Sequence, residues 1–281
     1  MIKKITETFR GADNRPTLLD ATWMDNGAAK PIVIFSHGYK GYKDWGAWNL
    51  VADAFANAGF IFVKFNFSHN GGTVEQPIDF PDLEAFGQNN YSKELSDLGI
   101  VIDWCLNSEV IPDAEKKKEQ IFLIGHSRGG GISVLKAAQD TRIKALVTWA
   151  SVSDYAVRFP KGTAFDKWRE TGVYYVKNGR TKQEMPHYFQ FYEDFDKNRH
   201  QLDIRAAAES LDKPFLIIHG EEDMAVSPDE ARALHRWNQQ SKLLWIPGTG
   251  HTFGSRQPYH EQKMPEALQK VVVETIGFLR K

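Results

Sequence analysis

The chain has 281 residues, 42% of them hydrophobic and 25% charged, so it can build a packed core and does not have the composition of a disordered segment. A formal net charge of −1 gives no support to a nucleic-acid or anionic-membrane partner. The apolar runs are strand-sized, Cys105 is the one cysteine, and no signal-peptide stretch follows Met1, so we expect a cytoplasmic protein without disulfides or membrane spans.

Taken in chain order, the apolar residues predict strands that alternate with amphipathic helices. Almost wholly apolar strands are typical of a parallel sheet covered on both faces, and this alternation predicts an α/β fold with a mostly parallel eight-stranded sheet and helices on both faces. The expected strands are 5–9, 18–23, 32–36, 60–65, 121–124, 145–150, 215–219 and 243–246. The expected helices cover about 48–55, 95–105, 127–139, 228–238 and 262–279.

Two stretches interrupt the alternation. Residues 68–90 form a long polar and aromatic loop after the fourth strand, and residues 151–210 separate the sixth strand from the seventh. A structureless loop of the second length is improbable in a compact domain. We therefore expect a single domain over 1–281, with 151–210 as a small helical cap that is rich in Phe, Tyr and Trp.

The segment "IFLIGHSRGGG" carries the most specific motif of the chain. Gly125-His-Ser-Arg-Gly129 fits the pattern G-x-S-x-G, with a predicted strand before it and a predicted helix after it. In that setting a sharp turn exposes the serine hydroxyl, which predicts Ser127 as a nucleophile. The alternative interpretation is that Ser127 only caps the helix.

A serine nucleophile needs a base and a carboxylate that orients the base. Asp223 follows the seventh strand and His251 follows the eighth, in the chain order Ser, Asp, His that this motif requires. Ligands of open α/β sheets gather at the carboxyl ends of the strands, where all three residues fall. Glu221, Glu222 and Asp154 are the competing carboxylates.

Two further strand ends predict the remaining parts of a site. Gly38 ends the third strand region, and the backbone N–H groups of Tyr39 and Arg128 are the expected oxyanion donors. The Arg128 side chain is a candidate for a substrate carboxylate or for an ion pair with an acidic residue. Gly38, His69 and Asn70 are candidate substrate contacts, although His69 and Asn70 fit a polar glycine turn equally well.

The motifs HGY, GHSRGG, HGEED and GTGH occur in an order that resembles the α/β-hydrolase superfamily over essentially the full chain. Within it, the chain is similar to bacterial feruloyl/cinnamoyl esterase-like and dienelactone-hydrolase-like proteins, and to the catalytic domain of the prolyl oligopeptidase group. The resemblance implies Ser127 as nucleophile, Asp223 as acid, His251 as base, and Tyr39 and Arg128 as oxyanion donors. Dienelactone hydrolases proper carry a cysteine where this chain has its serine.

These observations predict a serine hydrolase, most simply a carboxylesterase for small or aromatic acyl esters. A serine peptidase or aminoacyl amidase of prolyl-oligopeptidase type would use the same triad. A binding protein that retains the hydrolase fold without catalysis is the alternative from another class. We expect a small-molecule ester as partner and neither a cofactor nor a metal; the sequence leaves the oligomeric state open.

Overall fold

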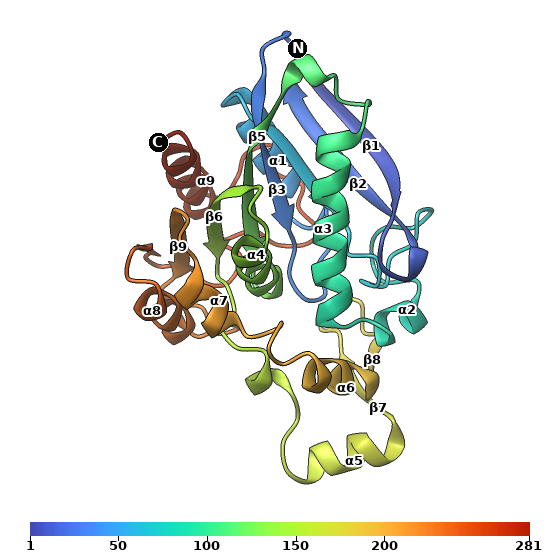
Figure 1. Cartoon of the computed structure of the whole chain (residues 1–281). Coiled ribbons are helices and arrows are strands. Elements are labelled where there is room, and N and C mark those ends of the chain that lie inside the picture. The colour runs from blue at the N-terminus through green and yellow to red at the C-terminus, as the bar shows by residue number, and fades with distance from the viewer.

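The chain, seen in a computed structural model that describes residues 1–281, forms an eight-stranded sheet between layers of helices (Figure 1). The strand order is β1-β2-β4-β3-β5-β6-β9-β10, parallel from β4 onward, with β1 and β2 antiparallel at one edge. The strands are β1 (Ile2–Arg10), β2 (Pro16–Met24), β3 (Lys30–Ser36), β4 (Ile61–Phe65), β5 (Lys116–His126), β6 (Ile143–Trp149), β9 (Phe215–Gly220) and β10 (Lys242–Ile246). All eight strands expected from the sequence are therefore present.

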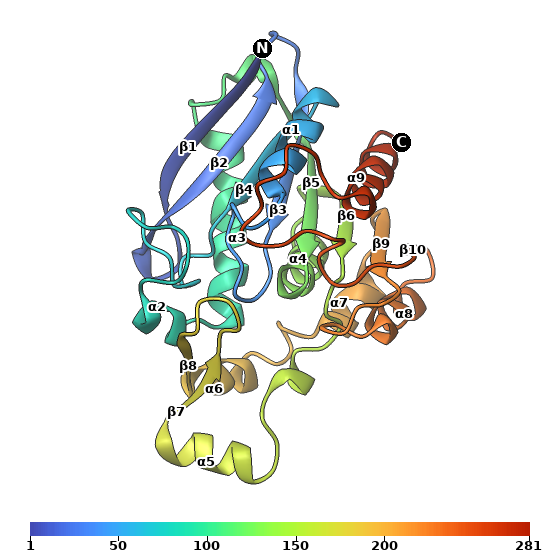
Figure 2. The same cartoon turned by 180° about the vertical axis from the view of Figure 1, so that it is seen from behind.

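Helices cover both faces of this sheet. One face packs against α3 (Tyr91–Asn107), α4 (Arg128–Gln139), α7 (Ile204–Ser210) and α8 (Pro228–Trp237), and the other against α1 (Trp48–Asn57) and α9 (Glu266–Leu279) (Figures 1 and 2). This burial on both faces explains why β3 and β4 are almost wholly apolar. The last helix begins at Glu266 rather than near Gln262, after Pro265, whose extended backbone lies outside the helix.

The segment 151–210 folds against one end of the sheet, but it is not purely helical. Between α5 (Thr163–Thr171) and α6 (Gln190–Lys197) it contains an antiparallel hairpin of β7 (Val173–Lys177) and β8 (Glu184–Tyr188). The expectation of a helical cap is corrected to a mixed cap on this point. The sequence signal was Asn178-Gly179 directly after a run of β-branched and aromatic residues, a pattern that favours a hairpin.

The carboxyl ends of the parallel strands point toward the cap (Figures 1 and 2). The loops after β3, β5, β9 and β10 therefore meet at one edge of the sheet, with the β7–β8 hairpin beside them. The segment 68–90 also lies at this end and includes the short helix α2 (Leu83–Gly87), whose first turn is capped by Asp82. None of the helices is long and apolar enough to cross a membrane.

Candidate active site

Ser127 occupies a sharp turn between β5 and α4. Its backbone has φ 58° and ψ −121°, in the region of positive φ that residues with a side chain rarely adopt. The turn is possible because its flanks are glycines. A Cβ on Gly125 would lie 2.3 Å from the carbonyl oxygen of Gly129, and a Cβ on Gly129 would lie 2.3 Å from the carbonyl oxygen of His37.

The hydroxyl of Ser127 is free. It makes no capping hydrogen bond to α4, although the residue stands at the helix start, and no other protein atom bonds to it. The residue is 8% exposed, and it lines two cavities that His251 also lines. The helix-cap interpretation therefore has no support in the geometry, and the hydroxyl faces open space beside a histidine.

His251 and Asp223 are joined by a short hydrogen bond. His251 Nδ1 lies 2.7 Å from Asp223 Oδ2, while Asp223 Oδ1 accepts the backbone N–H groups of Ala225 at 2.8 Å and Val226 at 2.9 Å. Burial would raise the pKa of Asp223, but hydrogen bonds from His219 and His251 outweigh it and hold that pKa well below its usual range. Asp223 is thus an anion held at Nδ1 of the imidazole ring.

The competing carboxylates have other positions. Glu221 and Glu222 are exposed, and Asp154 accepts the backbone N–H of Ala156 at 2.7 Å. Sequence reasoning missed His219, a fully buried residue whose Nε2 lies 3.3 Å from Asp223 Oδ2. Its position at the end of β9, just before the acidic loop, was the available signal.

The loop after β3 brings a backbone N–H close to Ser127. A Cβ on Gly38 would lie 2.8 Å from the Ser127 Cβ, so only glycine lets the loop approach this closely. The N–H of Tyr39 donates to no protein acceptor, and Arg128 is the first residue of α4, whose N–H has no partner within the helix. Two backbone N–H groups without a protein acceptor, one in the loop after β3 and one at the start of α4, therefore flank Ser127.

His37 holds this loop and was not singled out by the sequence. Phe67 N–H donates to its Nε2 at 3.2 Å, so its Nδ1 carries the proton and donates to the carbonyl oxygen of Gly38 at 2.9 Å. Burial lowers the pKa of His37 to about 4, which keeps the ring neutral. The neutral His37 ring makes two hydrogen bonds, and these fix the position of Gly38.

The side chain of Arg128 makes the ion pair that the sequence left open. Its Nη1 lies 3.3 Å from Glu94 Oε1, and its guanidinium group lies over the rings of Tyr39 at 4.4 Å, and of Tyr91 and Phe191 at 5.3 Å each. Arg128 also lines one of the cavities at Ser127. It is therefore tied to the protein and still borders the space beside the serine.

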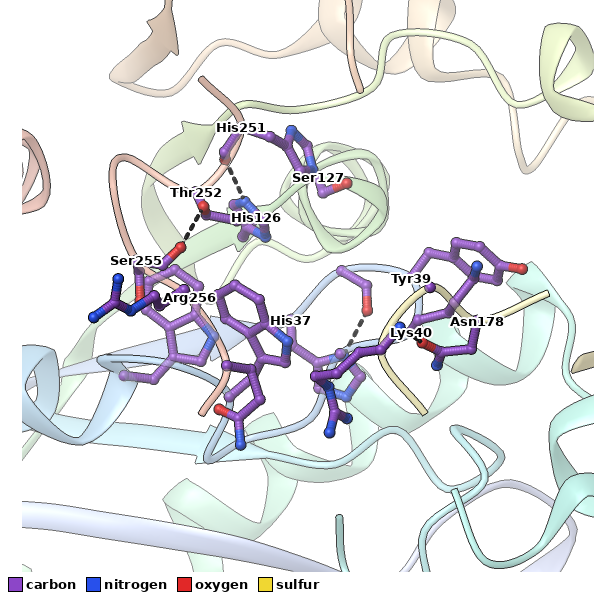
Figure 3. A pocket seen from close by; sticks show the side chains of 17 residues that line it. His37, Tyr39, Lys40, His126, Ser127, Asn178, His251, Thr252, Ser255 and Arg256 are labelled. Carbon is purple, nitrogen blue, oxygen red and sulfur yellow. Dashed lines mark hydrogen bonds between the residues drawn. The ribbon is translucent and has the colours of Figure 1, made fainter. Parts of the chain in front are cut away.

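Two cavities meet at Ser127 and His251. The polar cavity, of about 540 Å³, has His37, Lys40, Asn178, Ser255 and Arg256 among its lining residues (Figure 3). The apolar cavity, of about 480 Å³, has Tyr91, Val152, Tyr155, Tyr174, Phe191 and Val226 among its lining residues. Tyr39 and Lys40 border both. Both volumes suit small-molecule ligands.

Of the three candidate substrate contacts, one lines a cavity and two are bonded within the protein. Gly38 lines the polar cavity, whereas His69 and Asn70 line neither cavity. His69 contacts the Ser68 hydroxyl at 2.9 Å, and Asn70 accepts the N–H of Gly72 at 2.9 Å within its own turn. The polar-turn interpretation therefore fits these two residues. No cluster of His, Cys, Asp or Glu has the geometry of a metal site.

Comparison with known proteins places this chain among hydrolases. A sequence profile of the prolyl oligopeptidase family matches residues 47–272. A provisionally named esterase/lipase of Mycoplasma pneumoniae is 23% identical over 240 residues, which cover 78% of this chain and 81% of that protein.

Two solved structures share the α/β-hydrolase fold with this chain. Est1E from Butyrivibrio proteoclasticus, solved with bound ferulic acid, has a TM-score of 0.68 at 20% identity, covering 100% of this chain and 97% of that one. The dienelactone hydrolase of Anabaena variabilis has a TM-score of 0.64 at 16% identity, covering 99% and 97%. The superfamily resemblance read from the sequence is thereby confirmed.

Proposed function

The chain belongs to the prolyl oligopeptidase family, and from that premise we propose that this hydrolase is a serine carboxylesterase acting on small or aromatic acyl esters. The observation that carries the proposal is the convergence at one point of a free serine hydroxyl on a strained turn, a histidine, and a carboxylate 2.7 Å from that histidine. A binding protein without catalysis has no use for this arrangement.

The proposed reaction follows the acyl-enzyme route. Ser127 Oγ attacks the acyl carbonyl carbon, and its proton passes to Nε2 of His251, while Asp223 holds the opposite nitrogen. The oxygen that becomes negative lies against the N–H groups of Tyr39 and Arg128. The alcohol leaves with the proton from His251, and a water molecule activated by the same histidine then releases the acid. Hydrogen bonds between nucleophile and base are often loose without substrate, so a free Ser127 hydroxyl is compatible with this role.

The apolar cavity supports the choice of acyl group. Three rings of the cap, Tyr155, Tyr174 and Phe191, line it together with Tyr91 from α3. Flat apolar groups gain by burying area against such rings and by offset stacking. The other cap aromatics, such as Phe159 and Trp168, are buried in the core of the cap and do not line this cavity.

Family membership favours one alternative, a serine peptidase or aminoacyl amidase. The two activities are separated by kcat/KM for a methyl hydroxycinnamate, a short aliphatic ester and an aminoacyl anilide. We expect both esters to be cleaved faster than the anilide. A preference for the anilide of about tenfold, or ~1.4 kcal/mol in the transition state, would replace the esterase with the peptidase.

The catalytic proposal itself is tested with a fluorophosphonate probe and Ser127→Ala. We expect the probe to modify Ser127, and the variant to fold normally while losing activity by roughly four to six orders of magnitude. Activity of Ser127→Ala within about tenfold of the wild type would exclude Ser127 as the nucleophile. A native protein that neither reacts with the probe nor cleaves any ester or anilide would support the binding-protein alternative.

A further inference from the structure

The polar cavity has a one-sided charge. Lys40, Arg180 and Arg256 are among the residues that line it, and no aspartate or glutamate is. A cavity with walls of one charge sign attracts ligands of the other sign, because the low-dielectric walls focus the field. The apolar cavity is also lined by cations and by no carboxylate, namely Lys40, Arg128 and Arg158, but Arg128 and Arg158 form ion pairs with Glu94 and Glu230. Lys40 borders both cavities, and the hydrolysis of a neutral ester does not require a positive charge there.

The three cations of the polar cavity differ in how they are paired. Arg180 forms an ion pair with Asp79, and Arg256 lies 3.5 Å from Glu261 with 76% of its side chain exposed. Lys40 has no carboxylate within 4.0 Å. The polar contact of its Nζ is a long one, 3.4 Å to the carbonyl oxygen of Lys177 in β7. Lys40 is therefore the cation that remains available to a ligand.

Lys40 is also held in a costly position. It directly follows the oxyanion residue Tyr39, borders both cavities, and has φ 53°, in the left-handed region. Partial burial, with a smaller effect of the nearby Arg128 charge, lowers the pKa of Lys40. The Nζ lies 5.0 Å from the centre of the Tyr39 ring, a neutral partner, so a negative ligand would add the charged contact that this ammonium group lacks.

Asn178 provides a second donor in the same cavity (Figure 3). Its Oδ1 accepts the backbone N–H groups of Arg180 at 3.0 Å and Thr181 at 3.3 Å, which fixes the orientation of the amide. Its Nδ2 donates to no protein atom and is not sealed from solvent, although the residue is only 6% exposed. The cap hairpin thus aligns an amide donor next to the strand end that contacts Lys40.

We propose that the polar cavity binds the alcohol portion of the substrate, and that this portion carries an anionic oxygen group, a carboxylate or a phosphate, held by Lys40 and Asn178. This inference rests on the proposed esterase function, in which the acyl group occupies the apolar cavity. Hydrolysis then releases an aromatic or small acid from one cavity and a hydroxy acid or hydroxyalkyl phosphate from the other. An enzyme that joins an acyl group to such an anionic alcohol must supply the substrate.

The test uses pairs of benzoate esters that share the acyl group and have an anionic or a neutral alcohol portion. The anionic substrates are 4-(benzoyloxy)butanoate and 2-(benzoyloxy)ethyl phosphate, and the neutral references are 4-(benzoyloxy)butanamide and 2-(benzoyloxy)ethanol. The measured quantity is the ratio of kcat/KM for an anionic ester to kcat/KM for its neutral reference. A misfolded fraction cancels in this ratio, because both values come from one preparation.

We expect the wild-type ratio to exceed one for at least one anion, and the larger ratio identifies carboxylate or phosphate as the preferred group. Lys40→Met keeps an unbranched apolar side chain without the charge and should lower the ratio roughly tenfold to a hundredfold, the size of a charge-assisted hydrogen bond. Lys40→Arg should retain most of the preference. Asn178→Asp, which replaces a donor by a negative charge at constant shape, should also lower the ratio.

Lys177→Met is the matched control, because it removes an exposed positive charge next to the cavity from a residue that does not line it. It should leave the ratio unchanged. Wild-type ratios of one or less for both anions, or equal ratios in the wild type and Lys40→Met, would overturn the inference while ester cleavage by Ser127 persisted. Failure of the proposed function is a different result, in which Ser127→Ala retains activity toward the neutral esters.

Discussion

The two carboxylate oxygens of Asp223 have different tasks. Oδ1 accepts two backbone N–H groups of its own loop and so fixes the carboxylate, while Oδ2 faces His251 Nδ1 at 2.7 Å and the buried His219 at 3.3 Å. The hydrogen bonds from the loop N–H groups to Oδ1 would remain if the Oδ2 oxygen were replaced by an amide nitrogen. This division makes it possible to change the partner of the imidazole without releasing the loop.

Asp223→Asn is expected to reduce kcat by about 10⁴, because the amide group would donate to His251 and stabilise the wrong tautomer of the ring. The measurement is kcat for a good ester substrate, with near-ultraviolet circular dichroism to confirm the fold. Asp154→Asn, a change in the carboxylate that competed for this role, is the control and should cost far less. If Asp154→Asn had the larger effect, the acid would lie after β6.

Gly38→Ala is expected to lower kcat/KM roughly a hundredfold, the cost of losing one oxyanion donor. Its Cβ would lie 2.8 Å from the Ser127 Cβ and 3.3 Å from the carbonyl oxygen of His126, so the loop that carries the Tyr39 N–H must move. The measurement is kcat/KM for an ester, with Gly277→Ala as a control at a distant exposed glycine. Equal activity of the two variants would show that the Tyr39 N–H is not a donor to the oxyanion.

At the scale of elements, the sequence predicted well what buried strands and their ends dictate. The eight strands were recognisable because burial on both faces requires continuous apolar runs. The rule that sites gather at the ends of such strands selected Ser127, Asp223 and His251 as candidates, and the structure brings these three residues to one edge of the sheet. The β7–β8 hairpin was missed, because its strands are short and half exposed, and aromatic density alone does not separate a helix from a hairpin.

The rule that sites gather at strand ends does not show which side chains at those ends point into the cavities. His69 and Asn70 follow β4 and lie at the correct edge of the sheet, yet their side chains bond to residues of the protein body and not to a ligand space. Lys40 was not identified, since nothing in a single sequence shows which lysine lacks a partner. Strand ends locate a site, whereas only the packing of loops decides which side chains enter it.

One element offers a simple gain in stability. Gly277 lies inside α9, is exposed, and has no atom within 4 Å of the place where a Cβ would stand. Gly277→Ala should raise the free energy of unfolding by about 0.5–1 kcal/mol, because alanine loses less conformational entropy in a helix. Chemical denaturation measures this change. A decrease in stability would mean that the C-terminal end of α9 is not helical in solution.

At the scale of the whole molecule, the cap is fastened to the body next to the site. The Tyr39 hydroxyl bonds to His187 Nε2 at 2.9 Å, and the Ser92 hydroxyl donates to Asp194 at 2.8 Å. The indole N–H of Trp168 donates to the carbonyl oxygen of His187 at 2.8 Å, so His187 contacts both the cap core and the loop after β3. Stability of the cap and geometry of the site are thereby coupled through His187.

Four buried histidines link the stability of the molecule to acid. Burial, the largest cause in each case, lowers the pKa of His37 and His69 to about 4 and those of His126 and His187 to about 3. The unfolded chain binds protons at these sites below pH ~6.5 and the folded chain does not, so the free energy of unfolding decreases as pH falls from about 6.5 toward these values. Asp97, with a pKa raised to about 7 by burial, acts in the opposite direction.

His187→Gln isolates one of these contributions. Between about pH 6 and pH 4, the slope of the unfolding free energy against pH should be smaller than in the wild type by about 1.4 kcal/mol per pH unit, since one fewer proton is taken up on unfolding. Urea titrations at several pH values measure the slope, and His260→Gln at an exposed position is the control. An unchanged slope would mean that His187 already carries a proton in the folded protein.

The strained backbone of Ser127 affects how natural selection acts at this position. A residue at φ 58° and ψ −121° costs about 1–3 kcal/mol unless it is glycine, so Ser127→Gly should be more stable than both the wild type and Ser127→Ala. Selection for abundance alone would therefore favour a copy with glycine at this position and no activity. Under the proposed mechanism, a descendant that retains serine in this turn has been kept by selection for the reaction, because stability alone would favour glycine.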